Sequence, residues 1–206
     1  MIAKQKIHKL YLLVSALVVL HGTILLMGGH IGSFNVKAFR AYTVLSNYLV
    51  VIGFLLMLVL YNNKGKLRSY ISASVLVSIT VTGLVYNLIL VPVMPEATMV
   101  FSYYSNFVTH LLSMVLALFN YFFFEKKGTF TFKHILAGMA FPFAYWIVFI
   151  SIGEKINYYP YFFMNPTEIG WLMTFVWFAI ILTVITALGL LLVLFDKRRS
   201  KKEIVS

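Results

Sequence analysis

Polar residues that could do chemistry recur inside long apolar stretches of this 206-residue chain. Thr43 and Asn47 are four residues apart in one stretch, and Asn106 and His110 are four residues apart in another. Residues at this spacing share one face of a helix. A neutral imidazole can act as a general base near pH 7, and a Thr hydroxyl needs such a base to become a nucleophile. Thr43 and His110 are therefore the candidate catalytic residues of an acyl-transfer site.

Other polar residues could support this pair. An amide N–H can donate to the oxyanion of a tetrahedral intermediate, so either Asn47 or Asn106 is predicted to stabilise it. Ser46 is an alternative nucleophile to Thr43. Five residues are predicted to stabilise the oxyanion or bind substrate: Asn47, Asn106, Ser46, Tyr86 and Asn87. All five lie in the halves of their apolar stretches that are predicted to face the same side of the membrane.

Each of these residues also has a purely structural interpretation. Thr and Ser in membrane helices usually hydrogen-bond to the helix backbone, and Asn often links neighbouring helices. A histidine inside a membrane span is a functional candidate by default, although it can instead make a structural hydrogen bond. His21 is open to both interpretations.

The sequence predicts neither a metal site nor a cofactor. The chain has no cysteine, and His21 and His110 are the only histidines well inside apolar stretches, which is too few for a typical ligand set.

The composition indicates an integral membrane protein. Hydrophobic residues make up 61% of the chain and charged residues 11%, whereas soluble domains carry about 25% charged residues. The mean hydropathy is +0.91. The apolar stretches are continuous rather than alternating, which excludes a β-barrel of the outer-membrane type. The net charge of +11 is spread between apolar stretches, so it does not predict nucleic-acid binding.

We expect an all-α membrane protein that consists of one bundle of six transmembrane helices. Each stretch is long enough to cross about 30 Å of hydrocarbon, where a helix satisfies its own backbone hydrogen bonds. The predicted spans are approximately 9–28, 38–61, 69–91, 101–124, 133–153 and 168–195.

The basic residues predict the orientation. Fourteen of the 17 Lys and Arg residues lie in the two termini and in the second and fourth loops, so the positive-inside rule predicts that both termini are cytoplasmic. The first span lacks a small-residue cleavage site after it and is expected to be retained as a helix. The predicted location is the plasma membrane of a bacterial cell.

The polar residues then converge on the outer half of the bundle, where they predict a polar cavity. An aromatic segment, 157–166, follows the fifth span on this side. It is predicted to be either a lid over the cavity or a loop in the interfacial aromatic belt.

Two motifs carry a family resemblance. They are Phe39-Arg40-Ala41-Tyr42-Thr43-Val44-Leu45-Ser46-Asn47 and Ser105-Asn106-Phe107-Val108-Thr109-His110-Leu111-Leu112-Ser113, and the pattern Pro160-Tyr161-Phe162 accompanies them. With six spans and cytoplasmic termini, the chain resembles the androgen-induced/ADTRP family of transmembrane threonine hydrolases and the bacterial Pr-six-Pr group of membrane proteins. The resemblance implies that Thr43 is the nucleophile, His110 its partner and a fatty acyl ester the substrate class.

The leading hypothesis is an intramembrane hydrolase of lipid-like esters, with membrane lipids and an amphipathic ester as its partners. The first alternative is a small-molecule transporter or ligand-binding membrane protein that uses the same cavity. A second alternative is a scaffold without catalytic function, in which Thr43 would face lipid. The sequence leaves the natural substrate, the oligomeric state and the route of substrate access open.

Overall fold

The computed structural model describes residues 2–28, 34–63, 66–93 and 104–205. These residues form helices and connecting turns without a strand, and six of the helical segments are long and apolar enough to cross a membrane. The predicted fold class, an all-α membrane protein with six spans, is confirmed.

The first two spans are α1 (Ile2–Leu26) and α2 (Tyr42–Val59), and α2 follows the short 3-10 helix η2 (Val36–Arg40). The third and fourth spans each change helix type along their length. The third consists of α3 (Leu67–Leu84), the π-helix η3 (Val85–Leu90) and α4 (Val91–Val93). The fourth consists of α6 (Tyr104–Phe107), the π-helix η5 (Val108–Leu112), α7 (Ser113–Phe119) and the π-helix η6 (Asn120–Phe124).

The last two spans are α8 (Phe132–Ile152) and α9 (Pro166–Val205), which are joined through the 3-10 helix η7 (Phe162–Met164). Gly170 interrupts the start of α9 with a φ of 78°, in the left-handed region that favours glycine. The break separates one helical turn from the long remainder of α9.

The observed helix ends differ from the predicted span ends by one to four residues at most positions, by seven at the start of α1 and by ten at the end of α9. The second span was expected from residue 38, but residues 36–40 form η2, which carries Lys37 and Arg40, and α2 begins at Tyr42. Thr43 therefore lies in the first turn of its helix. The first helix extends back through the basic N-terminal segment to Ile2.

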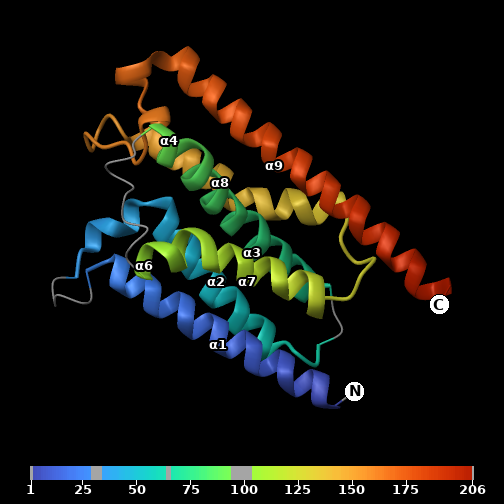
Figure 1. The fold of residues 1–206 in the computed structure, drawn as a ribbon. Helices are drawn as coiled ribbons and strands as arrows, with labels where there is room; N and C mark the ends of the chain where they lie inside the picture. The colour runs from blue at the N-terminus through green and yellow to red at the C-terminus, as the bar shows by residue number, and fades with distance from the viewer. Residues whose placement is uncertain (1, 29–33, 64–65, 94–103, 206) are drawn as a thin grey trace.

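The third span occupies the centre of the bundle. It packs against α2 on one side, α8 on another and the fourth span on a third, and α1 packs against α2. In Figure 1, α9 runs along the outer edge of the bundle and both chain termini lie at the same end. An even number of membrane crossings requires this placement.

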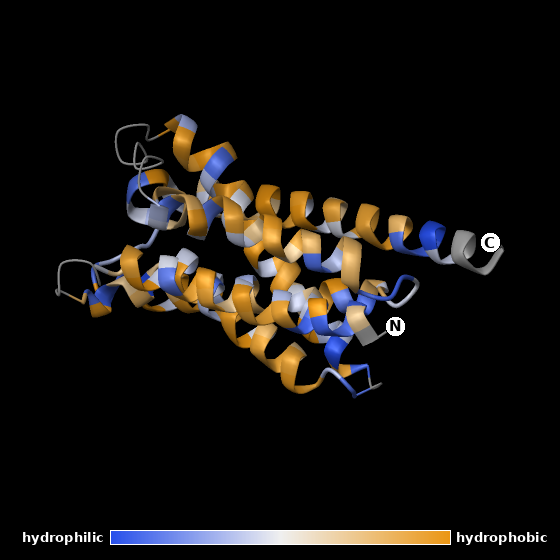
Figure 2. Ribbon diagram, turned by 60° about the horizontal axis from the view of Figure 1, so that its bottom comes forward, coloured by the Kyte–Doolittle hydropathy of each residue, from blue (hydrophilic) through white to orange (hydrophobic). Residues whose placement is uncertain are grey.

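Two apolar clusters fill the interior. One joins α1, α2, α3 and α7 around Leu12, Phe54 and Ile79, and the other joins α3, α8 and α9 around Ile135 and Phe149. Apolar side chains also remain exposed along the outside of the helices, and Figure 2 shows the apolar middle of the bundle between more hydrophilic ends. This distribution suits a protein whose outer surface contacts lipid.

A buried carboxylate attaches the end of α9 to the bundle. Asp196 is completely buried and accepts hydrogen bonds from the Tyr121 hydroxyl and the Phe130 backbone N–H, both at 2.9 Å. Asp196 lies one residue beyond the last predicted span, 168–195, whereas the structure includes it in the long helix α9.

We predict that Asp196→Ala lowers the stability of the folded protein by about 2–4 kcal/mol, because it leaves two buried donors without an acceptor. Tyr121→Phe removes only one of these hydrogen bonds and is expected to cost about 1 kcal/mol. Thermal unfolding in detergent measures both effects. Glu168→Ala, which removes an exposed carboxylate from the same helix, is the control. Equal melting temperatures for Asp196→Ala and Glu168→Ala would contradict the prediction.

Candidate active site

The start of α2 is held in place by two tyrosines. The Tyr42 hydroxyl donates to the Ser78 carbonyl of α3 at 3.2 Å, and the Tyr145 hydroxyl of α8 donates to the Arg40 carbonyl at 2.7 Å. These bonds join the first turn of α2 to α3, and the end of η2 just before it to α8. Thr43, which belongs to this turn, is therefore rigidly placed.

The structure brings Thr43 and His110 together. Thr43 Oγ1 lies 3.3 Å from His110 Nε2, although the two residues are 67 positions apart in the chain. Both are buried, with exposed fractions of 9% and 7%. His110 belongs to the π-helix η5, and short π-helical segments are frequently found at functional sites.

The partners of the other ring nitrogen determine the tautomer of His110. Nδ1 lies 3.1 Å from the Asn106 carbonyl oxygen, which can only accept a hydrogen bond. Thr109 Oγ1 lies 3.2 Å from Nδ1 and itself donates to the Ser105 carbonyl, so it too acts as an acceptor toward the ring. Nδ1 therefore carries the proton in the neutral ring. Nε2 is left as an acceptor for the Thr43 hydroxyl, as a general base requires.

Tyr86 fixes the plane of the imidazole. The two rings stack with centroids 3.7 Å apart and planes inclined by 24°. Asn106 Nδ2 donates to the Tyr86 hydroxyl at 2.6 Å. Asn106 thus positions His110 in two ways, through its carbonyl oxygen and through Tyr86.

Asn47 links α2 to the fourth span. Its Nδ2 donates to the Thr43 carbonyl at 2.8 Å and to the Thr109 carbonyl at 2.9 Å. Asn47 uses both of its amide N–H donors within the protein, and Asn106 uses one of its two on Tyr86. Their observed contacts are those of residues that position the helices carrying Thr43 and His110.

Two further predicted site residues, Ser46 and Asn87, form hydrogen bonds to groups other than the imidazole ring. Ser46 Oγ lies 2.6 Å from Thr82 Oγ1 and 3.1 Å from the Thr43 carbonyl, so its partners do not include His110. Asn87 Nδ2 donates to the Gly83 carbonyl at 2.7 Å and approaches the His110 carbonyl at 3.5 Å.

His21 is placed on an exposed face of α1, where its ring contacts Tyr104 at a centroid distance of 5.6 Å. It does not line the cavity beside Thr43.

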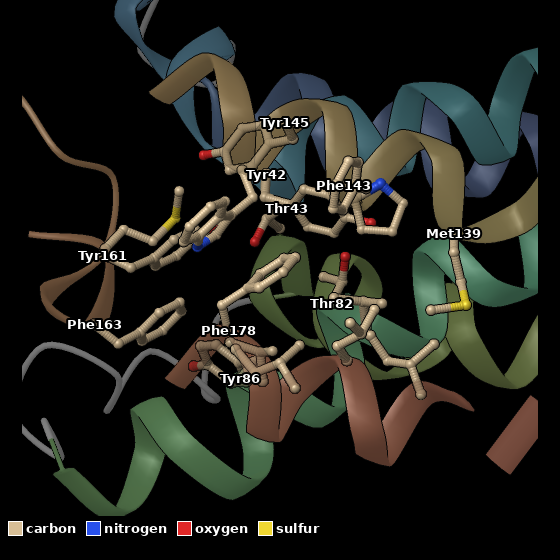
Figure 3. Close-up of a pocket in the computed structure, with 18 of the residues that line it drawn as sticks. Tyr42, Thr43, Thr82, Tyr86, Met139, Phe143, Tyr145, Tyr161, Phe163 and Phe178 are labelled. Carbon is tan, nitrogen blue, oxygen red and sulfur yellow. The ribbon is translucent and has the colours of Figure 1, made fainter. Parts of the chain in front are cut away.

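A largely apolar cavity adjoins the Thr43 hydroxyl. Its empty volume is about 690 Å³, including space open to the outside, and it lies between the third span, α8, α9 and the segment before α9. Figure 3 shows Thr43 and Thr82 at the wall of this cavity among aromatic side chains. The lining residues include Thr43, Thr82, Tyr86, Met139, Phe143, Tyr145, Trp146, Tyr161, Phe163, Phe178 and Ile181. His110 is not among the lining residues, so it approaches Thr43 from behind the cavity wall.

Tyr161 is a site residue that sequence reasoning did not assign. It belongs to the aromatic segment 157–166, and its hydroxyl faces the Thr43 side chain and the first backbone amides of α2. Burial raises the pKa of the Tyr161 hydroxyl to about 12, and hydrogen bonding to the side chain and main chain of Thr43 partly offsets this effect. Three residues of the segment, Tyr161, Phe163 and Met164, line the cavity. The aromatic pattern singled out the segment, but no local signal specified which tyrosine reaches Thr43.

Among the described residues, no three His, Asp or Glu side chains are grouped closely enough to hold a metal ion. The chemistry available at Thr43 is that of a hydroxyl, a neutral imidazole, a phenol and backbone amides.

No protein-family model matches the chain, and neither a curated protein nor a solved structure gives a significant match. The resemblance to transmembrane threonine hydrolases therefore stays a prediction from the two motifs.

We predict that His110 in the resting protein is a neutral imidazole protonated on Nδ1. Nitrogen NMR of protein labelled with ¹⁵N-histidine distinguishes the two ring nitrogens, and the His110→Gln variant assigns the signal. A ring protonated on Nε2 would contradict the prediction, because Thr43 would then have no acceptor at 3.3 Å.

Proposed function

We propose that this protein is an intramembrane hydrolase of lipid-like esters, with Thr43 as nucleophile and His110 as general base. The observation that carries the proposal is the hydroxyl–imidazole pair at 3.3 Å, in which Thr43 also borders a largely apolar cavity.

The reaction would proceed through an acyl-threonine. Thr43 Oγ1 attacks the ester carbonyl carbon while its proton moves to His110 Nε2. The tetrahedral intermediate collapses, and the leaving alkoxide takes that proton and departs as an alcohol. Water then attacks the acyl-threonine and gives one proton to His110. Collapse of the second intermediate returns that proton to Thr43 and releases the fatty acid.

One donor is suitably placed to stabilise the oxyanion. The first amides of an α-helix have no intrahelical partner, and the N-cap residue of α2, Ala41, provides no side-chain cap. The Tyr161 hydroxyl faces these amides and the Thr43 side chain, and the amides orient it by donating to its oxygen. We propose that the oxyanion accepts the Tyr161 O–H, in place of the expected Asn47 or Asn106.

The lining of the cavity favours an acyl chain as the part of the substrate that it holds. Phe143 borders the cavity and is 46% exposed, and we propose that the cavity opens to lipid beside this side chain. A lipid-like ester can therefore enter sideways from the bilayer. The water needed for deacylation would enter past the Tyr161 segment.

We place the protein in the plasma membrane of a bacterial cell with both termini cytoplasmic. The excess of Lys and Arg at the termini and in the second and fourth loops supports this orientation. The Thr43 site then lies in the outer half of the bilayer, because Thr43 follows the loop between the first two spans.

The first functional prediction concerns Thr43 and His110. We expect Thr43→Ala to lower the hydrolysis of a fluorogenic fatty acyl ester at least about a thousandfold, and His110→Ala to lower it about 100–10,000-fold. The double variant is expected to be no slower than Thr43→Ala, since the two residues act as a unit. A fluorophosphonate probe should label the wild type and not Thr43→Ala.

Thr23→Val is the matched control, because Thr23 is another buried threonine whose hydroxyl bonds only to its own helix, at the Val19 carbonyl. Retained turnover and labelling in Thr43→Ala would overturn the proposal. Loss of labelling in Ser46→Ala with retention in Thr43→Ala would assign the nucleophile to Ser46.

The second functional prediction concerns Tyr161. We expect Tyr161→Phe to lower kcat about 100–1,000-fold with a smaller change in KM, because one donor to the oxyanion is lost while the aromatic wall is kept. Tyr159→Phe, in the same segment but outside the cavity lining, is the control. Equal kcat values for the two variants would remove Tyr161 from the reaction.

A further inference from the structure

A second cavity lies at the other end of the bundle, where the two termini are found. Its empty volume, which includes space open to the outside, is about 1720 Å³. It is bordered by the start of α1, the turn after α2, the start of α3, and the segment that connects η6 to α8. We call it the basic groove and define it by its charged lining residues: Lys66, Arg68, Glu125, Lys126 and Lys133.

The charges in the basic groove are not balanced. Arg68 pairs with Glu125 at 3.2 Å. Lys66, Lys126 and Lys133 are exposed, and no ion pair is found for them among the described residues. Three ammonium groups around one cavity repel one another unless an anion lies between them.

The helices around the groove add to its positive potential. Lys66 is the N-cap of α3 and makes no side-chain capping bond, and Lys133 lies in the first turn of α8. Neither helix has an acidic residue in its first turn. The N-terminal end of a helix carries a partial positive charge and favours anions, so lysines at two such ends are unfavourable without a bound anion.

The groove contains a second hydroxyl–imidazole pair, but its proton arrangement does not suit catalysis. Ser69 Oγ lies 3.0 Å from His134 Nε2 and donates to the Lys66 carbonyl at 2.7 Å. His134 Nδ1 accepts from the Thr131 backbone N–H at 3.2 Å. Nε2 therefore carries the proton and donates to Ser69, so the imidazole cannot act as its base. The pair links α3 to the first turn of α8. Anion binding is therefore the function that the lysines of the groove support.

The surroundings indicate that the anion is carried by a lipid. The groove lies where the apolar spans end, and aromatic side chains border it beside the lysines, among them Tyr70, Phe124 and the 46% exposed Phe132. A free anion needs no apolar wall, whereas a phospholipid presents a phosphate next to its glycerol and acyl carbons.

We propose that the basic groove binds the phosphate of an anionic phospholipid headgroup through Lys66, Lys126 and Lys133. The bound lipid would neutralise the two helix ends. This site is separate from Thr43 and does not depend on the proposed hydrolase activity.

The test uses the full chain purified in detergent. Native mass spectrometry titrates dioctanoyl phosphatidylglycerol, with dioctanoyl phosphatidylcholine as the zwitterionic comparison. We expect selective binding of the anionic lipid. The triple variant Lys66→Gln/Lys126→Gln/Lys133→Gln should weaken it about 100-fold, on the basis of about fivefold for each lysine near an anionic headgroup. The control Lys37→Gln/Lys155→Gln removes exposed lysines outside the groove and should leave the affinity unchanged.

The same titration is repeated with inorganic phosphate as competitor. No displacement of the lipid by millimolar phosphate supports a lipid headgroup as the ligand, whereas displacement by micromolar phosphate assigns the site to the free anion and overturns the lipid proposal. Equal affinities for the two lipids, or an unchanged affinity in a normally folded triple variant, would also overturn it. Because the substituted lysines are exposed, an unchanged melting temperature is expected and establishes that each variant is folded.

Discussion

The hydrogen bond between His110 Nδ1 and the Asn106 carbonyl decides what the candidate active site can do. It leaves Nε2 unprotonated, 3.3 Å from the Thr43 hydroxyl. Inside a bilayer no bulk water is available to replace a missing partner, so this hydrogen bond is much harder to exchange than it would be on a soluble surface. The stacked ring of Tyr86 then holds the imidazole ring in the orientation that points Nε2 at the Thr43 hydroxyl.

The same constraint explains why so many polar side chains surround the pair. Each buried donor that the chemistry requires brings further polar groups that must also be satisfied. The side-chain amides of Asn47 and Asn106 donate to neighbouring helices, although Asn47 Oδ1 is buried without a partner among the described residues. Tyr42 bonds the start of α2 to α3, and Tyr145 bonds α8 to Arg40 just before α2. The placement of the Thr43 hydroxyl therefore depends on a polar network that joins α2 to the helices around it.

The two ends of the bundle show that residue types alone do not specify a catalytic pair. Thr43 with His110 and Ser69 with His134 are both hydroxyl–imidazole contacts, at 3.3 and 3.0 Å. Backbone partners make Nδ1 a donor in His110 and an acceptor in His134, which reverses the direction of the second hydrogen bond. One end suits general-base chemistry, and the other, with three lysines that form no ion pair with any described residue, suits an anionic ligand.

The sequence by itself determined the six-span helical fold, because long apolar stretches can satisfy their backbone in lipid only as helices. It also singled out Thr43 and His110, since polar residues are rare and costly in such stretches. Only the tertiary structure decided their contact, the engagement of Asn47 and Asn106 within the protein, and the position of Tyr161 at the start of α2. Helical periodicity fixes which residues share a face of one helix. Which faces of different helices contact each other, and which path a loop takes, depend on packing between segments that are distant in the sequence.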